Sequence, residues 1–348
     1  MKPNCSLAVH EITGITELAQ LALDWDDLFA RCPGASTFQR PEWLISWMEV
    51  FNPGELWTLA VRQAGSLVGI APLYIQQKGS ERTLAPVGAA ISDYLDWLFD
   101  PAVSSSVLAC LFQHIRDRNS VWSIFDLTDI PGHSPLLSLT DMAEWEMESK
   151  FQDACPVLQL PATFEELQHV IPRPRLRSLK SARKKIQLLG EVRVEVASRE
   201  NLDDLLATLF RLHRTRWSQF GMTGVLTGPD VQRFHQRVAP ALLEKRVLRL
   251  YALRLHDRVL ASLYALFEKD VVYCYLQGFD PEFAEFSPGA QILAAVIEDA
   301  VRHHKRSIDF LRGREAYKYC WGARDVPTYR LRARKRPPLR DVPVQIAA

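Results

Sequence analysis

The stretch LRLYALRLHDRVLASLYALFEKDVVYCYLQGF, residues 248–279, decides the fold because it contains three strand-like runs in immediate succession. The runs Leu248–Leu255, Val259–Phe267 and Val271–Phe279 are rich in aliphatic and aromatic residues, and only short polar breaks separate them. Such breaks are short enough for hairpins, so the three runs predict an antiparallel meander.

The segments on both sides of this stretch complete one unit. Upstream, the alternating segment Glu191–Ala197 predicts a strand, and Asn201–Phe220 and Pro229–Arg246 have helical periodicity. Downstream we expect a helix, a strand, a short helix and a final strand, at Ala290–His304, Ser307–Leu311, Glu315–Trp321 and Thr328–Arg334. The order β-α-α-β-β-β-α-β-α-β indicates an α/β fold with a mixed sheet.

The first half of the chain repeats this order without a repeat of the residues themselves. The predicted strands are Leu7–Ile12, Leu56–Gln63, Leu67–Gln76, Leu84–Val87, Ser123–Asp129 and Met147–Leu160, and the predicted helices are Thr16–Arg31, Pro41–Phe51 and Ser105–Asp117. A length of 348 residues suits about two domains of ~150 residues each. We therefore predict tandem units over residues 1–160 and 161–348, with a boundary near Pro161.

Composition excludes several classes of protein. Hydrophobic residues make up 47% and charged residues 24%, as in ordinary folded domains, and 42 Lys and Arg face 41 Asp and Glu. No apolar run approaches the ~20 residues of a membrane span, and residues 1–5 lack the apolar core of a secretory signal. The six cysteines are scattered, without metal-ligand spacing. We therefore expect a cytoplasmic protein without a metal site.

Several motifs resemble one family of transferases. They are SPGAQIL at 287–293, SIDFLRGREAYKYCW at 307–321, LVGIAPL at 67–73, SDYLDW at 92–97 and HRTRW at 213–217. They resemble the GNAT superfamily of acyltransferases, in particular its CelD/BcsL-like members, which are related to the FemAB-like transferases. The resemblance implies two tandem GNAT-like acyl-CoA N-acyltransferase domains, with the acceptor on the N-terminal domain and the acyl donor on the C-terminal domain. Acetyl-CoA or another acyl-CoA is the implied co-substrate.

A donor site is expected where the third strand of the meander ends and the next helix begins. The first turn of a helix offers free N–H groups and a positive dipole end, which suit a pyrophosphate. A helix start that binds nothing is the alternative. The expected donor-binding residues are Gln277, Gly278, Phe279, Pro288, Gly289 and Ala290.

The densest group of reactive side chains follows, at Asp309, Glu315, Tyr317 and Lys318. Asp309 lies in an otherwise apolar strand, where a carboxylate is costly unless it is hydrogen-bonded or functional. We expect Asp309 or Glu315 to help deprotonate an amine, or Asp309 to be structural. The resemblance implies that Tyr317 or Lys318 stabilises the departing thiolate or the bound acceptor; a solvated lysine is the alternative.

Acceptor-binding candidates lie in both halves. Asp93, Tyr94 and Asp96 follow a short strand and are suited to holding an amine, although turn-forming aspartates are common. Trp217 and Trp321 are the aromatic candidates for the acceptor cleft. The expected acceptor is a small molecule, a saccharide or a peptide.

Two basic runs, Pro172–Lys185 and Arg330–Arg340, contain no acidic residue. These runs could bind the CoA 3′-phosphate, the phosphates of tRNA or an anionic membrane surface, or they could simply form a solvated helix face. The neutral overall balance argues against nucleic acid. The predicted function is acyl transfer from CoA to an amine or hydroxyl of an envelope or exopolysaccharide precursor. The alternatives are a FemAB-type aminoacyl-tRNA-dependent transferase and a non-catalytic scaffold in polysaccharide biosynthesis.

Overall fold

The computed structural model describes residues 6–139, 145–218, 221 and 224–335 of the chain. The strands are β1 Ala8–Ile12, β2 Glu55–Leu56, β3 Thr58–Gln63, β4 Ser66–Ala71, β5 Leu73–Lys78, β6 Glu81–Pro86, β7 Leu98–Phe99, β8 Ile124–Pro131, β9 Trp145–Gln159, β10 Val192–Val196, β11 Leu248–Leu255, β12 Arg258–Glu268, β13 Val271–Phe279, β14 Ser307–Asp309 and β15 Arg324–Lys335. The α-helices are α1 Ile15–Gln20, α2 Ala22–Arg31, α3 Pro41–Phe51, α4 Ser104–Asp117, α5 Leu167–Val170, α6 Arg173–Gln187, α7 Leu202–Ser218, α8 Pro229–Glu244, α9 Pro288–Arg302 and α10 Ala316–Tyr319.

These strands form two sheets. Four strands pair in the order β1-β3-β4-β7, and eleven pair in the order β10-β11-β12-β13-β14-β9-β15-β8-β6-β5-β2. The antiparallel meander predicted for residues 248–279 is confirmed, since β12 pairs antiparallel with β11 and with β13. The mixed α/β fold class is therefore confirmed as well.

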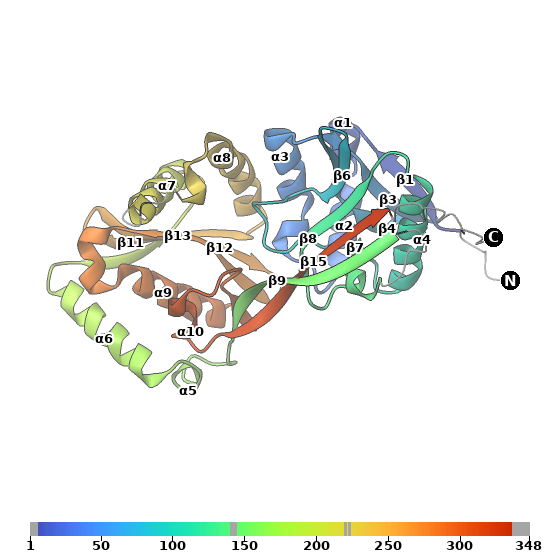
Figure 1. The fold of residues 1–348 in the computed structure, drawn as a ribbon. Coiled ribbons are helices and arrows are strands. Elements are labelled where there is room, and N and C mark those ends of the chain that lie inside the picture. The colour runs from blue at the N-terminus through green and yellow to red at the C-terminus, as the bar shows by residue number, and fades with distance from the viewer. Residues whose placement is uncertain (1–5, 140–144, 219–220, 222–223, 336–348) are drawn as a thin grey trace, which may run out of the picture.

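The long strands β9 and β15 run antiparallel across the middle of the molecule and join the two halves (Figure 1). β9 comes from the first half and pairs with β14, whereas β15 comes from the second half and pairs with β8. Each half also contains a parallel pair, β6 with β8 and β13 with β14. The large sheet is thus continuous. The pairing pattern nevertheless repeats, because β9, the last strand of the first half, lies beside the parallel pair of the second half, and β15, the last strand of the second half, lies beside the parallel pair of the first. The boundary near Pro161, just after β9, stays a prediction.

Helices of both halves share one core. Leu205, Leu206 and Leu209 on α7 pack in the same buried cluster as residues of α2, α3 and α8. Trp43 of α3 meets Phe234 of α8 edge to face, with ring centroids 4.9 Å apart. Burial of such aromatic side chains favours association strongly. The two halves are therefore packed against each other, and a site between them has fixed walls.

The sequence prediction differs from the structure in several places. The predicted strand Leu56–Gln63 is divided between β2 and β3, which lie in different sheets. Thr16–Arg31 is two helices, interrupted at Leu21, and Leu67–Gln76 is two strands in different sheets, because Pro72 has no N–H for the ladder. The basic segment Pro172–Lys185 folds as helix α6, which the predicted element order omitted; Pro174 is tolerated because it lies in the first turn. Residues 219–220 of the predicted helix and 336–340 of the second basic run lie outside the described residues.

Candidate active site

The site lies where β13 and β14 separate. The two strands pair only between Val271–Tyr273 and Ser307–Asp309, and β13 then continues alone to Phe279. Its pairing with β12 shifts register so that Tyr275 is an extra residue, a β-bulge. Bulges re-aim side chains and interrupt pairing. The splayed end of β13 therefore leaves backbone and side-chain groups facing an opening in the sheet.

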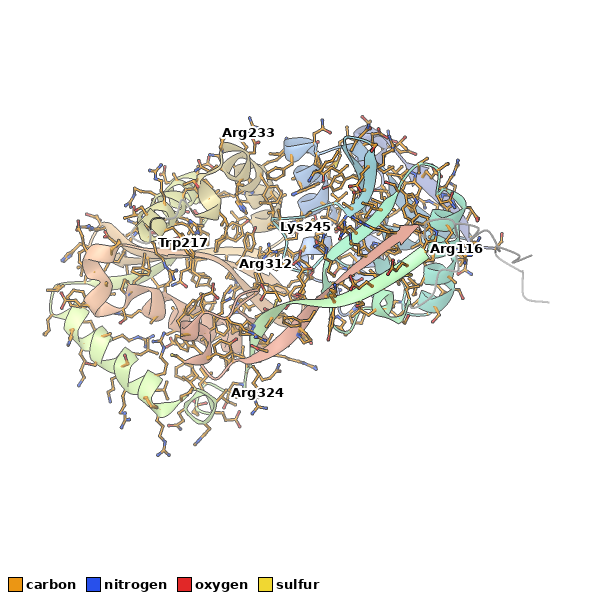
Figure 2. The ribbon with its side chains drawn as sticks, viewed as in Figure 1. Arg116, Trp217, Arg233, Lys245, Arg312 and Arg324 are labelled. Carbon is orange, nitrogen blue, oxygen red and sulfur yellow. The ribbon has the colours of Figure 1, made fainter. Side chains whose placement is uncertain are left out.

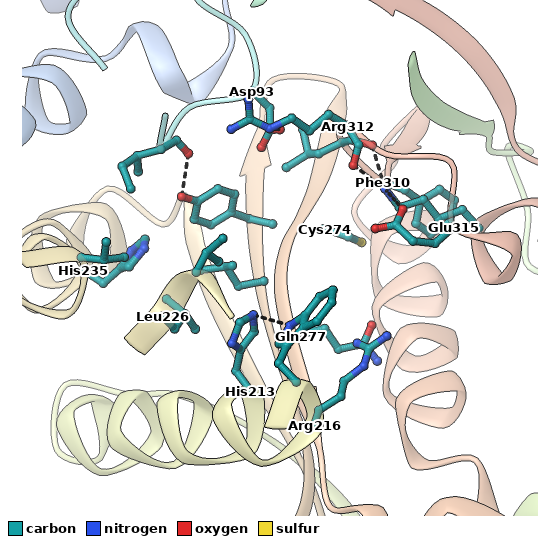
Figure 3. Close-up of a pocket in the computed structure, with 18 of the residues that line it drawn as sticks. Asp93, His213, Arg216, Leu226, His235, Cys274, Gln277, Phe310, Arg312 and Glu315 are labelled. Atoms are coloured by element: carbon teal, nitrogen blue, oxygen red, sulfur yellow. Dashed lines mark hydrogen bonds and ion pairs between the residues drawn. The ribbon is translucent and has the colours of Figure 1, made fainter. Parts of the chain in front are cut away.

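A cavity of about 250 Å³ fills this opening, and both halves of the chain line it. Figure 3 shows β13 contributing Cys274 and Gln277, with Arg312 and Asp93 at one end and Arg216 at the other. His213 and His235 reach it from the two helices α7 and α8. Polar groups thus converge on a partly apolar space, as in ligand sites.

Arg312 ties the second half to the first at this cavity. Its Nε lies 2.8 Å from Asp93 Oδ1, one terminal nitrogen lies 3.1 Å from Asp129 Oδ1, and the other donates to the carbonyl of Ala90 at 3.3 Å. Burial raises the pKa of Asp93 to about 7, an effect that the Arg312 charge opposes and the Asp129 charge reinforces. Sequence reasoning missed Arg312, although it stands inside the motif at 307–321.

Lys318 holds the loop that carries Arg312. Its side chain is buried, and Nζ donates to the carbonyls of Leu311, Arg312 and Gly313 at 2.9, 2.7 and 3.0 Å. The same ammonium lies 2.9 Å from Oε2 of Glu315. All three ammonium protons are thereby engaged. This geometry gives Lys318 the role of positioning residue, while its predicted contact with the thiolate or acceptor stays a prediction.

Asp309 and Tyr94 form a buried pair beside the cavity and are not among its lining residues. The Tyr94 hydroxyl donates to Asp309 Oδ2 at 2.7 Å, and the amide of Leu311 donates to Oδ1 at 2.8 Å. Burial raises the pKa of Asp309 to about 6, although both hydrogen bonds act in the opposite direction. Both carboxylate oxygens therefore have structural partners.

Glu315 and Tyr317, in contrast, line the cavity itself. The Glu315 side chain is half exposed beside Lys318. Burial, with a further contribution from the Glu315 charge, raises the pKa of the Tyr317 hydroxyl above its usual value. Tyr317 therefore keeps its proton at neutral pH and is able to donate it.

Two histidines that the sequence analysis did not single out complete the wall. The Trp217 indole N–H donates to His213 Nε2 at 2.9 Å, so the neutral ring carries its proton on Nδ1. Neither ring nitrogen of the buried His235 has a hydrogen-bond partner among the described residues. Burial lowers the pKa of His213 to about 4 and that of His235 to about 3. Both rings are neutral at pH 7; the motif HRTRW was the available signal for His213.

A second cavity of about 270 Å³ adjoins the first at the start of α9. Gln277 and Tyr317 line both cavities, so the two spaces are neighbours. Gln277 Nε2 also donates to the carbonyl of Gly289 at 2.8 Å. Five of the six residues predicted to bind the donor line this second cavity: Gln277, Phe279, Pro288, Gly289 and Ala290.

Gly278, the sixth, packs against α7 instead. A Cβ at Gly278 would lie 2.5 Å from the backbone nitrogen of His213, so this residue permits a close approach of strand and helix. Like Tyr94 and Asp309, the predicted residues Asp96 and Trp321 line neither cavity. Asp96 accepts hydrogen bonds from Ser134 and from its neighbour's amide, and Trp321 is fully buried.

Two arginines flank the start of α9 in the second cavity. Arg175 of α6 lies with its guanidinium carbon 4.4 Å from the centre of the Trp321 ring, and that of Arg216 lies 5.2 Å from the Phe279 ring. Neither arginine is paired with a carboxylate within the described part of the chain. Nε of Arg175 is buried without a hydrogen-bond partner there, and burial lowers the pKa of this side chain. Two unpaired cations beside a helix N-terminus form a site suited to a phosphate group.

Comparisons with known proteins agree with this architecture. Residues 173–319 match the family model of the acetyltransferase (GNAT) domain. The crystal structure of FemX is similar with a TM-score of 0.67 and 12% identity, covering 93% of this chain and 96% of that one. The C-terminal domain of a putative lysylphosphatidylglycerol synthetase from Agrobacterium fabrum gives 0.59 and 12%, covering 90% and 91%. A tandem GNAT protein from the clavulanic acid biosynthesis pathway gives 0.50 and 13%, covering 96% and 99%.

No curated protein matches the chain. At such low identities the solved structures show the fold, a GNAT-like architecture that includes tandem members. The match of residues 173–319 to the acetyltransferase domain supports an acyltransferase, as the sequence predicted. The assignment to the CelD/BcsL type stays a prediction. Across the described residues, no helix is long and apolar enough to cross a bilayer, and no cluster of three potential metal ligands occurs.

Proposed function

We propose that the protein transfers an acyl group from a CoA thioester to an amine or hydroxyl of an acceptor bound between its two halves. The observation that carries the proposal is the start of α9, where the unpaired cations Arg175 and Arg216 line a cavity that continues into the splayed sheet. A phosphate-bearing donor fits this place because the helix end and both guanidinium groups favour negative charge.

The donor's thioester would lie along the unpaired part of β13. A backbone N–H near Leu276–Gly278 would donate to its carbonyl oxygen, which becomes an oxyanion when the acceptor attacks. The adjoining cavity of about 250 Å³ is small, which supports an acetyl or similarly short acyl group. The two cavities would thus hold the two ends of one donor.

The side chains that line the cavity supply the proton transfers. Of the two carboxylates predicted to act as the base, Asp309 and Glu315, only Glu315 lines this space, so we assign it the proton that the amine releases as the new N–C bond forms. The C–S bond then breaks, and Tyr317, which retains its proton, supplies it to the leaving thiolate. Lys318 and Asp309 act indirectly, through the loop at 311–313 that they fix.

The acceptor would meet Asp93, Arg312 and the neutral rings of His213 and His235. These groups suit hydroxyls and amines, as in a saccharide or peptide of an envelope or exopolysaccharide precursor. His235 has unsatisfied nitrogens in the wall, which favours a polar acceptor group at that end. One structural neighbour is described as a putative lysylphosphatidylglycerol synthetase, so a lipid acceptor belongs to the same range.

An aminoacyl-tRNA is the alternative donor, because its terminal phosphates would meet the same two arginines. The test is calorimetric titration with acetyl-CoA, free CoA and tRNA. In the acyl-CoA case, Arg175→Gln and Arg216→Gln should each weaken CoA binding about tenfold or more, the value of a charged hydrogen bond. Arg116→Gln, an exposed arginine on α4, is the matched control and should change nothing.

Three outcomes separate the candidates. Binding of CoA that depends on both arginines supports the proposal. Binding of tRNA but not of CoA, with a steep dependence on salt, would make an aminoacyl-tRNA the donor in place of acyl-CoA. A folded protein that binds neither CoA nor tRNA would favour the remaining alternative, a non-catalytic scaffold.

A further inference from the structure

Helix α6 carries more positive charge than its packing uses. Only Leu179, Ala182 and Ile186 of this helix are buried. Within the described residues, Arg183 is the α6 cation that pairs with a carboxylate, Glu298 at 2.9 Å. The others that face solvent are Arg173, Arg177, Lys180, Lys184 and Lys185. Because the whole chain has a formal net charge of only +1, this helix is a local concentration of charge.

The helix lies at the outer edge of the second half (Figure 1), and side chains along its outer face point away from the molecule (Figure 2), whereas its three buried residues face inward. A cavity of about 600 Å³ opens beneath it, between α5, α6 and α9. The floor of this cavity is apolar, and Lys180, Arg183 and Lys184 lie on its rim. Two carboxylates, Glu165 and the paired Glu298, also line it. Floor residues include Leu167, Leu176, Leu179, Ile297 and Trp321.

Exposed apolar side chains flank the same surface. Leu188 and Leu189, directly after α6, are 87% and 49% exposed, and Phe164, which lines the cavity, is 50% exposed. Large apolar side chains beside a row of cations are typical of surfaces that rest on anionic membranes, where the apolar groups enter the interface and the cations meet the headgroups.

We infer that α6 and the cavity beneath it dock an anionic phospholipid of a membrane surface, with the phosphate at Lys180 and Lys184 and one acyl chain in the cavity. A nucleic acid would use the cations but would gain nothing from an apolar cavity or from exposed leucines. The cavity volume lies within the ~300–1,000 Å³ of ordinary ligand sites. Arg175 of the same helix lines the proposed donor cavity, whereas Trp321 lines the cavity beneath α6. The lipid site is therefore separate from the donor site, and the inference goes beyond the proposed function.

The first test is sedimentation of the full chain with vesicles. Phosphatidylcholine vesicles containing phosphatidylglycerol should bind the protein, and pure phosphatidylcholine vesicles should bind far less. The double variant Lys180→Gln, Lys184→Gln should lower the partition coefficient about 25-fold, since each cation near an anionic surface contributes about fivefold. The matched double variant Arg116→Gln, Arg214→Gln removes two other exposed charges and should behave as the wild type.

The second test separates the acyl chain from the headgroup. Calorimetry with a short-chain phosphatidylglycerol below its micelle concentration should show binding, whereas glycerol phosphate alone should bind far more weakly. Ala294→Leu, on the cavity wall, should weaken lipid binding several-fold without affecting CoA; Gln187→Trp, at an exposed lining position, serves if that variant fails to fold.

Equal binding of glycerol phosphate and lipid would overturn the inference, as would indifference to the lysine pair. Binding of tRNA that is lost with the same two lysines, without vesicle binding, would assign the surface to nucleic acid instead. If the lysine variant still binds CoA, a loss of vesicle binding in that variant arises at the lipid site and not at the donor site.

Discussion

Helices α4 and α9 occupy the same place in the two halves, yet their N-terminal ends differ. Each leads into a strand that pairs in parallel, β8 with β6 and β14 with β13. Before α4, the carboxylate of Asp100 accepts a hydrogen bond from the amide of Ala102 at 3.0 Å and pairs with Arg31 at 2.9 Å. Before α9, the corresponding region opens to a cavity flanked by Arg175 and Arg216.

The difference shows how one fold supports two roles. In the first half, the carboxylate of Asp100 places a negative charge of the chain itself in the turn before the helix, although no side chain caps the first N–H groups of α4. In the second half, cations gather there instead, and a ligand would have to bring the negative charge. The fold provides the helix end in both halves, whereas a few side chains decide whether it is closed or open.

The largest effect should come from Lys318, which fixes the loop peculiar to the second half. Lys318→Met keeps the aliphatic part of the side chain but leaves three carbonyls without their donor. Loss of hydrogen bonds to a charged group costs ~1.5–3 kcal/mol, so the free energy of unfolding should fall by about 3 kcal/mol. Urea unfolding measures this change.

The exposed Lys180→Met is the control for that variant and should change stability by less than about 0.5 kcal/mol. A wild-type unfolding curve for Lys318→Met would remove the positioning role. Full stability with lost transferase activity would restore the direct catalytic role that the sequence predicted.

A pH effect of up to about 3 kcal/mol should come from Asp309. Because burial raises its folded pKa to about 6, above the ~3.9 of an unfolded aspartate, the folded protein holds this proton more tightly. Its contribution is therefore present at low pH and is lost as pH rises from about 4 through 6. Asp309→Asn should flatten this part of the stability profile, measured by urea midpoints from pH 4 to 8. An unchanged slope would assign the titration to Asp93 or another group.

The sequence predicted most elements of the second half because their patterns are local. The strands at Leu248–Leu255 and Val271–Phe279 were predicted with the observed bounds. Helix α6 was missed because its many basic residues, together with Pro172 before the helix and Pro174 in its first turn, obscured a buried face of only three residues. Likewise, no local pattern shows that β9 and β15 exchange between the halves, since pairing over so long a distance depends on tertiary packing.

The candidate site was only partly predictable for the same reason. Gln277 and Gly289 are identified by a strand end and a helix start, which are local signals. Arg312, in contrast, gains its role from Asp93 and Asp129, about 200 residues earlier in the chain. Asp309 was singled out by its apolar strand and Lys318 by its motif, but the sequence does not reveal that buried structural partners engage both groups.

A smaller effect, of about tenfold in donor affinity, should follow from Gly289→Val at the open helix end. Its Cβ would lie 2.6 Å from Nε2 of Gln277, so the Gln277 side chain must shift, and the added methyl groups would crowd the helix start proposed for the phosphate. Helix propensity alone changes stability by less than about 1 kcal/mol. Calorimetry with CoA measures the affinity. Gly14→Val, before α1, where a Cβ meets no atom within 4 Å, is the control. Equal CoA affinity in Gly289→Val would remove the phosphate from this helix end.

The smallest effect is expected at the closed helix end. Asp100→Asn removes the charge that pairs with Arg31 but leaves a side-chain oxygen able to accept from Ala102, and the ion pair is partly exposed. Such pairs contribute ~0–1 kcal/mol, so the free energy of unfolding should fall by less than about 1 kcal/mol. CoA affinity should be unchanged, because Asp100 lies in the first half, away from the cavity at the start of α9 where the donor is proposed to bind. A threefold or larger change in CoA affinity, measured beside Gly289→Val, would mean that both helix ends influence the donor and that the two halves are less specialised than their side chains indicate.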